Sequence, residues 1–144
     1  MSKKKIRFII NPISGKTHKE YLPQQIKECL DPNRFDVDIS ITEYAGHAIE
    51  LAQEAVAQHY DIVATAGGDG SINEVGTQLI DTEVALAIIP CGSGNGLSRC
   101  LHIPLNPNKA LELINRKAIC QIDTVTVNDV PFISIAGTGY DAQV

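Results

Sequence analysis

This 144-residue sequence lacks an excess of basic residues. It has 12 Lys and Arg against 17 Asp and Glu, and its formal net charge is −5. Proteins that bind nucleic acids usually carry a basic stripe, whereas the only basic cluster here is Lys3, Lys4 and Lys5 near the N-terminus. The composition therefore indicates no nucleic-acid partner.

Two cysteine and histidine patterns are also missing. The four cysteines form no Cys-x-x-Cys pair, and the four histidines form no His-Glu-x-x-His pattern. These are spacings typical of zinc sites. Because a chain of this length can bury a sizeable apolar core without disulfides, we expect reduced thiols in a cytoplasmic protein.

Long apolar runs are absent as well. No segment approaches the roughly 20 residues that a membrane-spanning helix needs, and the N-terminal lysines are not followed by the apolar core of a signal peptide. We therefore expect no transmembrane segment.

The most informative stretch present is Asp61 to Glu74, where a short apolar segment runs into Gly67-Gly68-Asp69-Gly70. The segment reads as a buried strand, and the glycines let the backbone turn and approach a ligand closely. Ser71 and Glu74 have the spacing of a capping box, which predicts a helix that begins at Ser71. The first N–H groups of that helix would favour an anion such as phosphate.

Asp69 is the one acid of this turn. A carboxylate can lie beside phosphates when Mg²⁺ bridges the two, because Mg²⁺ prefers carboxylate, water and phosphate oxygens. The alternative reading is an ordinary strand-to-helix turn with a solvated aspartate.

Strands and helices alternate through residue 117. The expected strands are 6–10, 35–42, 62–66 and 84–89, and the expected helices are 18–30, 46–59, 71–80 and 108–116. This order predicts an α/β fold, Rossmann-like, with a mostly parallel sheet between two layers of helices. Strand 35–42 alternates apolar and polar residues, so we expect it near a sheet edge.

Ligands of such sheets bind beyond the carboxyl ends of the strands. Four segments should converge there: 11–16, Thr42, 67–74 and 92–95. The first of them is not a Walker A loop, because Ile10 occupies the place of its first glycine. The last misses the dinucleotide fingerprint, because Leu97 replaces its final glycine.

After Lys117 the pattern changes to two β-like runs, 119–127 and 131–135, which predict a hairpin. We expect residues 1–117 to form an α/β nucleotide-binding domain. Residues 118–144 would be the first strands of a second, antiparallel β-rich domain, most of which this chain would lack. The exposed strand 35–42 and this tail could each pair two copies into a homodimer.

Four motifs in this order resemble the nucleotide-site motifs of the diacylglycerol kinase catalytic family, which includes bacterial lipid kinases and the sphingosine and ceramide kinases. The motifs are Asn11-Pro12-x-Ser14-Gly15, Thr42-Glu43-x-x-Gly46-His47-Ala48, Gly67-Gly68-Asp69-Gly70-Ser71-x-Asn73-Glu74 and Pro90-x-Gly92-Ser93-x-Asn95.

The resemblance implies an ATP-dependent kinase that uses Mg²⁺ and transfers the γ-phosphate to a hydroxyl of a membrane lipid. Asp69 would be the catalytic carboxylate. It would act on the attacking hydroxyl or through Mg²⁺, which it would bind directly or through water. With Lys16 and Gly67 added from the loop and turn patterns, the candidate nucleotide-binding residues are Asn11, Pro12, Ser14, Gly15, Lys16, Thr42, Gly67, Gly68, Asp69, Gly70, Ser71, Asn73, Glu74, Gly92, Ser93 and Asn95. The implied partner is a lipid that a cytoplasmic protein contacts peripherally at the membrane surface.

The lipid itself stays open at this point. Ser71 stands where threonine is commoner in the family and keeps the hydroxyl, but Gly96 stands where many bacterial diacylglycerol kinases have aspartate, and Ser93-Gly94-Asn95-Gly96 is closer to sphingosine kinases. Diacylglycerol is the leading substrate, and a sphingoid base or another lipid is the alternative. An NAD kinase-like enzyme and a non-catalytic nucleotide-binding module are the remaining alternatives. Family members carry further metal-binding and general-base acids in their second domain.

Overall fold

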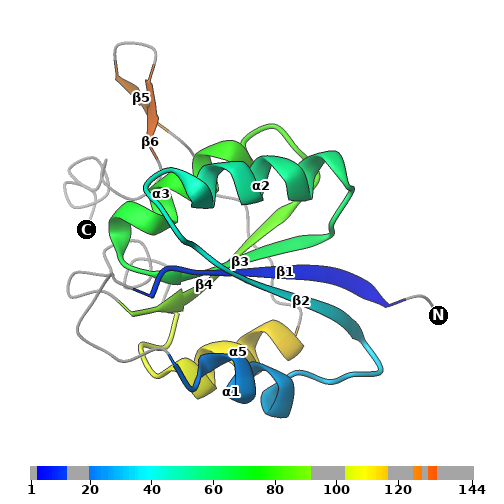
Figure 1. Cartoon of the computed structure of the whole chain (residues 1–144). Helices are drawn as coiled ribbons and strands as arrows, with labels where there is room; N and C mark the ends of the chain where they lie inside the picture. Colours follow the sequence, from blue (N-terminus) through cyan, green and yellow to red (C-terminus); the bar gives the residue numbers. More distant parts are fainter. Residues whose placement is uncertain (1–2, 13–19, 92–102, 117–124, 128–129, 133–144) are drawn as a thin grey trace.

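The structure is a computed structural model that describes residues 3–12, 20–91, 103–116, 125–127 and 130–132 (Figure 1). Its elements follow one another as β1 (Lys4–Ile10), α1 (Leu22–Cys29), β2 (Phe35–Ile41), α2 (His47–Ala57), β3 (Ile62–Gly67), α3 (Asp69–Gln78), β4 (Ala85–Pro90), α5 (Pro107–Asn115), β5 (Val125–Val127) and β6 (Val130–Phe132).

The first four strands form one parallel sheet in the order β2-β1-β3-β4. This confirms the predicted α/β fold and the edge position of strand 35–42, which is β2. β1 and β3 form the middle of the sheet. β2 lies outside β1 at one edge, and β4 lies outside β3 at the other edge. The junction between β1 and β3 is therefore the point where the strand order reverses, which is where open α/β sheets bind ligands.

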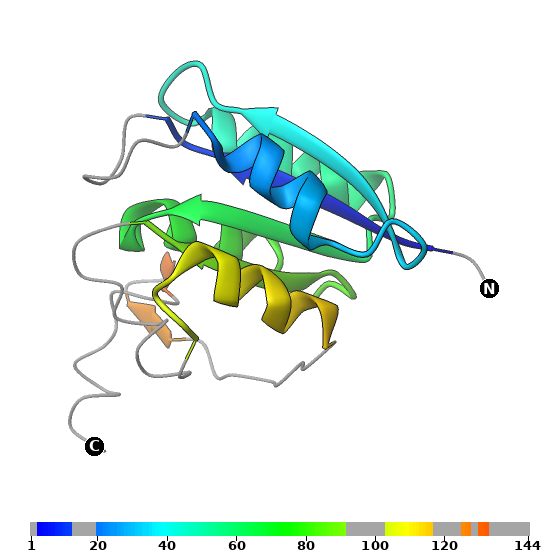
Figure 2. The same ribbon diagram turned by 90° about the horizontal axis from the view of Figure 1, so that it is seen from below.

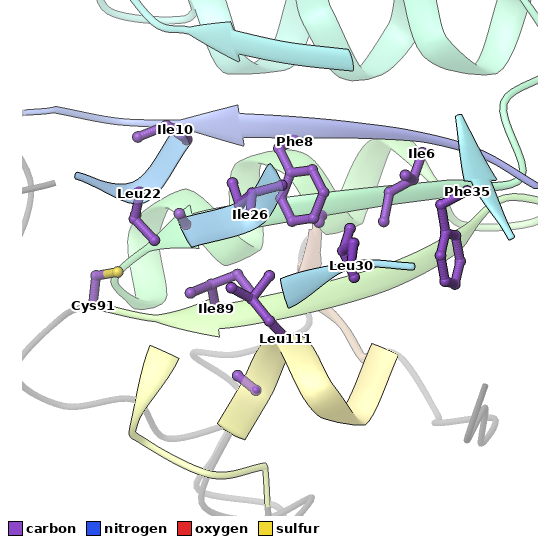
Figure 3. Packing of buried hydrophobic residues seen from close by; sticks show 13 residues of the cluster. Ile6, Phe8, Ile10, Leu22, Ile26, Leu30, Phe35, Ile89, Cys91 and Leu111 are labelled. Carbon is purple, nitrogen blue, oxygen red and sulfur yellow. The ribbon is translucent and has the colours of Figure 1, made fainter. Parts of the chain in front are cut away.

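Helices cover both faces of the sheet, as the element order predicted. Figures 1 and 2 show α2 and α3 on one face and α1 and α5 on the other. Each face has its own apolar cluster, and alternate residues of β1 enter one or the other: Phe8 packs with Ile26 of α1 and Leu111 of α5 (Figure 3), whereas Ile9 packs on the α2 and α3 side. Both faces of β1 are buried, which explains its nearly continuous apolar sequence.

Two helix starts differ from the sequence expectation. The helix expected at 18–30 begins at Leu22, with Pro23 in its first turn, a position that suits proline because its missing N–H is not needed there. The helix expected at Ser71 begins at Asp69, with Gly68 at the N-cap and no side-chain capping hydrogen bond. The capping box of Ser71 and Glu74 was therefore a wrong prediction, because Ser71 lies within the first turn.

The predicted hairpin after residue 117 is present, with β5 and β6 paired antiparallel. Whether it opens a second domain stays a prediction. Within the described ranges, none of the helices has the length and apolar character needed to cross a membrane.

One charged side chain lies inside the α2 side of the sheet. Arg7 of β1 is only 6% exposed, and it donates to Asp38 of β2 at 2.9 Å and to Glu54 of α2 at 3.4 Å. It also donates to the carbonyl oxygen of Leu51 and to the hydroxyl of Tyr60. Burial lowers the pKa of Arg7, but its hydrogen bonds to and charge interactions with Asp38 and Tyr60 together raise that pKa by more. The charged guanidinium therefore ties α2 to two strands.

We expect Arg7→Met to reduce the free energy of unfolding by about 1–3 kcal/mol, because it removes several hydrogen bonds of a charged group. The loss is not larger because the carboxylates of Asp38 and Glu54 are about half exposed and can be rehydrated. Urea unfolding of the variant measures the loss. The control is Lys27→Met on the exposed face of α1, where a change within about 0.5 kcal/mol is expected. Equal stability of the Arg7 variant and the wild type would contradict this role.

Candidate functional site

The first and third sequence motifs meet where the strand order reverses. Asn11 directly follows β1, and its backbone N–H donates to the carbonyl oxygen of Ala66 in β3 at 3.2 Å. Its side-chain Nδ2 donates to Oγ of Ser71 in α3 at 3.4 Å. Ser71 is only 8% exposed, so this hydrogen bond connects the end of β1 to the buried side of the first turn of α3. This confirms the predicted convergence for Asn11 and Ser71, whereas residues 13–16 of the first segment lie outside the described residues.

The N-terminus of α3 lies at this junction, two residues after β3. The first intrahelical bond runs from the N–H of Ile72 to the carbonyl oxygen of Gly68, so the N–H groups that precede Ile72 have no partner within the helix. Gly70 is exposed, and a Cβ added there would meet no atom within 4 Å apart from its chain neighbours and the backbone of its own helix. The arrangement offers backbone donors and free space together, which suits a phosphate group.

The second motif lies on the other side of β1. The N–H of Thr42 donates to the carbonyl oxygen of Ile10 at 2.9 Å, which places Thr42 beside the residue that precedes Asn11. The chain then turns into α2 through Gly46, whose φ of +87° requires glycine. Thr42 is therefore separated from the N-terminus of α3 by one strand, β1.

His47 holds this turn together. Its Nδ1 accepts a hydrogen bond from the backbone N–H of Glu43 at 3.0 Å, which leaves the proton of the neutral ring on Nε2. The ring also stacks on Tyr44, with centroids 4.4 Å apart and planes 9° apart. Sequence reasoning placed Gly46 and His47 in a motif but did not assign them this structural part.

Tyr44 lies in the same turn and was not singled out by sequence reasoning. Its ring is 55% exposed, and its hydroxyl donates to the carboxylate of Glu50 in α2. That hydrogen bond, with the nearby charges of Glu50 and Glu43, raises the pKa of Tyr44 above its ordinary value. The signal available in the sequence was an aromatic residue inside a motif, in a chain whose aromatic content is 5%.

The fourth motif begins beside the third. Gly67 pairs with Pro90 at the ends of β3 and β4, and the N–H of Cys91 donates to the carbonyl oxygen of Gly67 at 3.1 Å. The candidate residues Ser14, Gly15, Lys16, Gly92, Ser93 and Asn95 lie outside the described residues, so their part in the site stays a prediction.

The remaining candidates occupy the same end of the sheet. Pro12 is exposed next to Asn11, and Asp69 is the first residue of α3. Asn73 is half-buried and Glu74 exposed in the following part of the helix. Among the residues that the structure describes, no three His, Cys, Asp or Glu side chains are grouped so that they could hold a metal ion.

A parallel α/β sheet with a glycine-rich turn and a helix N-terminus at its switch point defines the class of nucleotide-binding α/β domains. Residues 5–127 match the family model described as the diacylglycerol kinase catalytic domain. The chain belongs to the diacylglycerol kinase catalytic-domain family.

Similar proteins support this assignment. A diacylglycerol kinase of Staphylococcus saprophyticus is 34% identical over 99% of the chain, and one of Bacillus subtilis is 36% identical over 94%. A crystal structure of a diacylglycerol kinase from Bacillus anthracis superposes with a TM-score of 0.77 at 29% identity, over 92% of the chain. The chain spans about half the length of these relatives, 47% and 46% of the two sequences and 49% of the crystallised chain.

Proposed function

We propose that this chain is the nucleotide-binding part of an ATP-dependent lipid kinase, with diacylglycerol as the leading substrate. The observation that carries the proposal is the contact of Asn11 with Ser71 at the N-terminus of α3. It joins two motifs of a kinase family at the point of the sheet where ligands bind. The names of the relatives support a lipid as the acceptor.

The described residues would each have a separate role in binding the nucleotide. The N–H groups of the first turn of α3, which have no partner within the helix, bind phosphate oxygens, and Gly70 has no side chain to obstruct them. Asn11 holds the first turn in place through Ser71, and Thr42 seats the nucleotide on the β2 side. Positioning and charge neutralisation supply most of the catalysis in phosphoryl transfer.

Asp69 is the residue we propose for the metal and for the reaction. As the first residue of α3 it adjoins the N–H groups that would hold the phosphates. Mg²⁺ is usually held by one or two carboxylates together with substrate phosphates rather than by a complete cage of protein ligands, so one acid beside a phosphate site fits this ion. When bound, Mg²⁺ would neutralise phosphate charge.

The lipid would be met at a membrane surface by peripheral contact, from the cytoplasmic side. We propose that surfaces other than those described make this contact. If two copies pair, the open edge of β2 offers unpaired backbone groups for it, and gel filtration at several concentrations tests that pairing.

The test of the proposed function is phosphorylation by the full-length protein with labelled ATP and Mg²⁺. The panel offers diacylglycerol, a sphingoid base, ceramide and phosphatidylglycerol in mixed micelles, and NAD in a separate reaction. Label in diacylglycerol is the expected result. Label in another lipid would keep the lipid kinase and correct its substrate, label in NAD would replace it by an NAD kinase, and ATP binding without any transfer would indicate a non-catalytic module.

A further inference from the structure

Tyr44 presents a flat aromatic face that is held rigidly. One side of its ring lies against His47 at 4.4 Å, and its hydroxyl is anchored on Glu50. His47 is itself fixed by the hydrogen bond from the N–H of Glu43. A ring that is 55% exposed and yet tied at two points loses little conformational freedom when a second ring stacks on it.

The Tyr44 ring lies at a distance from the proposed phosphate site that one nucleotide can bridge. Both of its contacts, His47 and Glu50, belong to the first turn of α2. This helix packs beside α3 on the same face of the sheet, where Gln53 donates to Gln78. The two helices begin at the carboxyl ends of β2 and β3, which β1 separates. Two interstrand spacings amount to roughly 10 Å, a distance that an extended nucleotide can bridge between its phosphates and its base.

We propose that the exposed face of Tyr44 is the surface on which the purine base of the bound nucleotide stacks, with His47 as the residue that holds the ring. This inference rests on the proposed function, because it places the base of the nucleotide whose phosphates lie at α3. It names a specificity-determining residue that the four motifs do not assign, since Tyr44 stands at a variable position of the second motif.

The charges around the ring favour a base over a lipid headgroup. Glu43 and Glu50, both exposed, flank Tyr44. Two carboxylates repel an anionic headgroup or phosphate, whereas a neutral base is not repelled and its ribose hydroxyls can donate to them. A tyrosine that anchors a membrane surface would be better placed among basic residues.

The experiment compares two ligands and four proteins. Calorimetric titration of full-length wild type, Tyr44→Ala, Tyr44→Phe and Tyr21→Ala is carried out with ATP and with inorganic tripolyphosphate, which has no base. Tyr21 is the matched control, an exposed tyrosine (44%) ahead of α1 on the opposite face of the sheet. Thermal unfolding of each variant confirms that the fold is kept.

The expected result is that Tyr44→Ala weakens ATP binding about tenfold or more and leaves tripolyphosphate binding unchanged. Tyr21→Ala should bind ATP as the wild type does. Tyr44→Phe keeps the ring and its stacking on His47 but loses the hydrogen bond to Glu50, so it should retain most of the ATP affinity that Tyr44→Ala loses. Wild-type ATP affinity in Tyr44→Ala overturns this inference and leaves the proposed function standing. Loss of binding to anionic vesicles in that variant, with ATP binding intact, likewise overturns it in favour of a membrane contact. A wild type that binds neither ligand overturns both proposals.

Discussion

Replacing Asp69 by alanine in the full-length protein is expected to lower the rate of lipid phosphorylation by at least about a thousandfold, which is the scale of removing a group that stabilises charge in the transition state. Asp69 is the first residue of α3 and adjoins the proposed phosphate site. The expected stability cost is small, at most about 1 kcal/mol, which is the scale of the interaction between an acid in the first turn and the helix dipole.

Three measurements separate the chemical part of Asp69 from a structural one. The variant's turnover, its thermal unfolding and its affinity for ATP with and without Mg²⁺ are compared with those of Asp69→Asn, which keeps the shape and removes the charge. Both variants should lose turnover and the dependence of ATP affinity on Mg²⁺. Glu83→Ala, an exposed acid shortly before β4 at the other end of the sheet, should change neither. Normal turnover in the Asp69 variants would remove this residue from the mechanism.

Gly70→Ala should separate stability from ligand binding. The new methyl group meets no atom within 4 Å beyond its chain neighbours and the backbone of its own helix, and alanine favours a helix by about 0.5–1 kcal/mol over glycine. The free energy of unfolding should therefore stay equal or rise. In a helix, Cβ points toward the N-terminus, which here is where the phosphate would lie. If two hydrogen bonds to phosphate are lost, each worth about 1.5–3 kcal/mol, ATP affinity falls about a hundredfold or more.

The matched control is Thr77→Ala near the other end of α3. It also improves helix propensity but removes the hydrogen bonds of the Thr77 hydroxyl with the carbonyl oxygen of Glu74 and with Gln78, so stability should change little. Because it lies two turns away from the phosphate site, ATP affinity should be unchanged. Urea unfolding and calorimetric titration of both variants give the two quantities. Unaltered ATP affinity in Gly70→Ala would mean that phosphate does not approach the first turn of α3.

Local patterns predicted most of the elements correctly. The apolar run before Gly67 and the alternation in strand 35–42 became β3 and β2, because burial on two faces or on one leaves a direct trace in the sequence. The start of α3 was misread for a physical reason. Ser71 and Glu74 satisfy the spacing of a capping box, but Gly68 takes the extended N-cap conformation directly before Asp69, and the Ser71 hydroxyl accepts a hydrogen bond from Asn11 instead.

By itself, the sequence determined the alternation of strands and helices, the glycine turn with its single acid, and the family. Only the tertiary structure decided that β1 lies between β2 and β3, and with it that Asn11 meets Ser71 across 60 residues. Only the tertiary structure showed that the Tyr44 ring stacks on His47 and that its hydroxyl donates to Glu50 of α2. The reason is that periodicity and turn chemistry act between near neighbours in the chain, whereas strand order and side-chain contacts depend on which distant segments pack together.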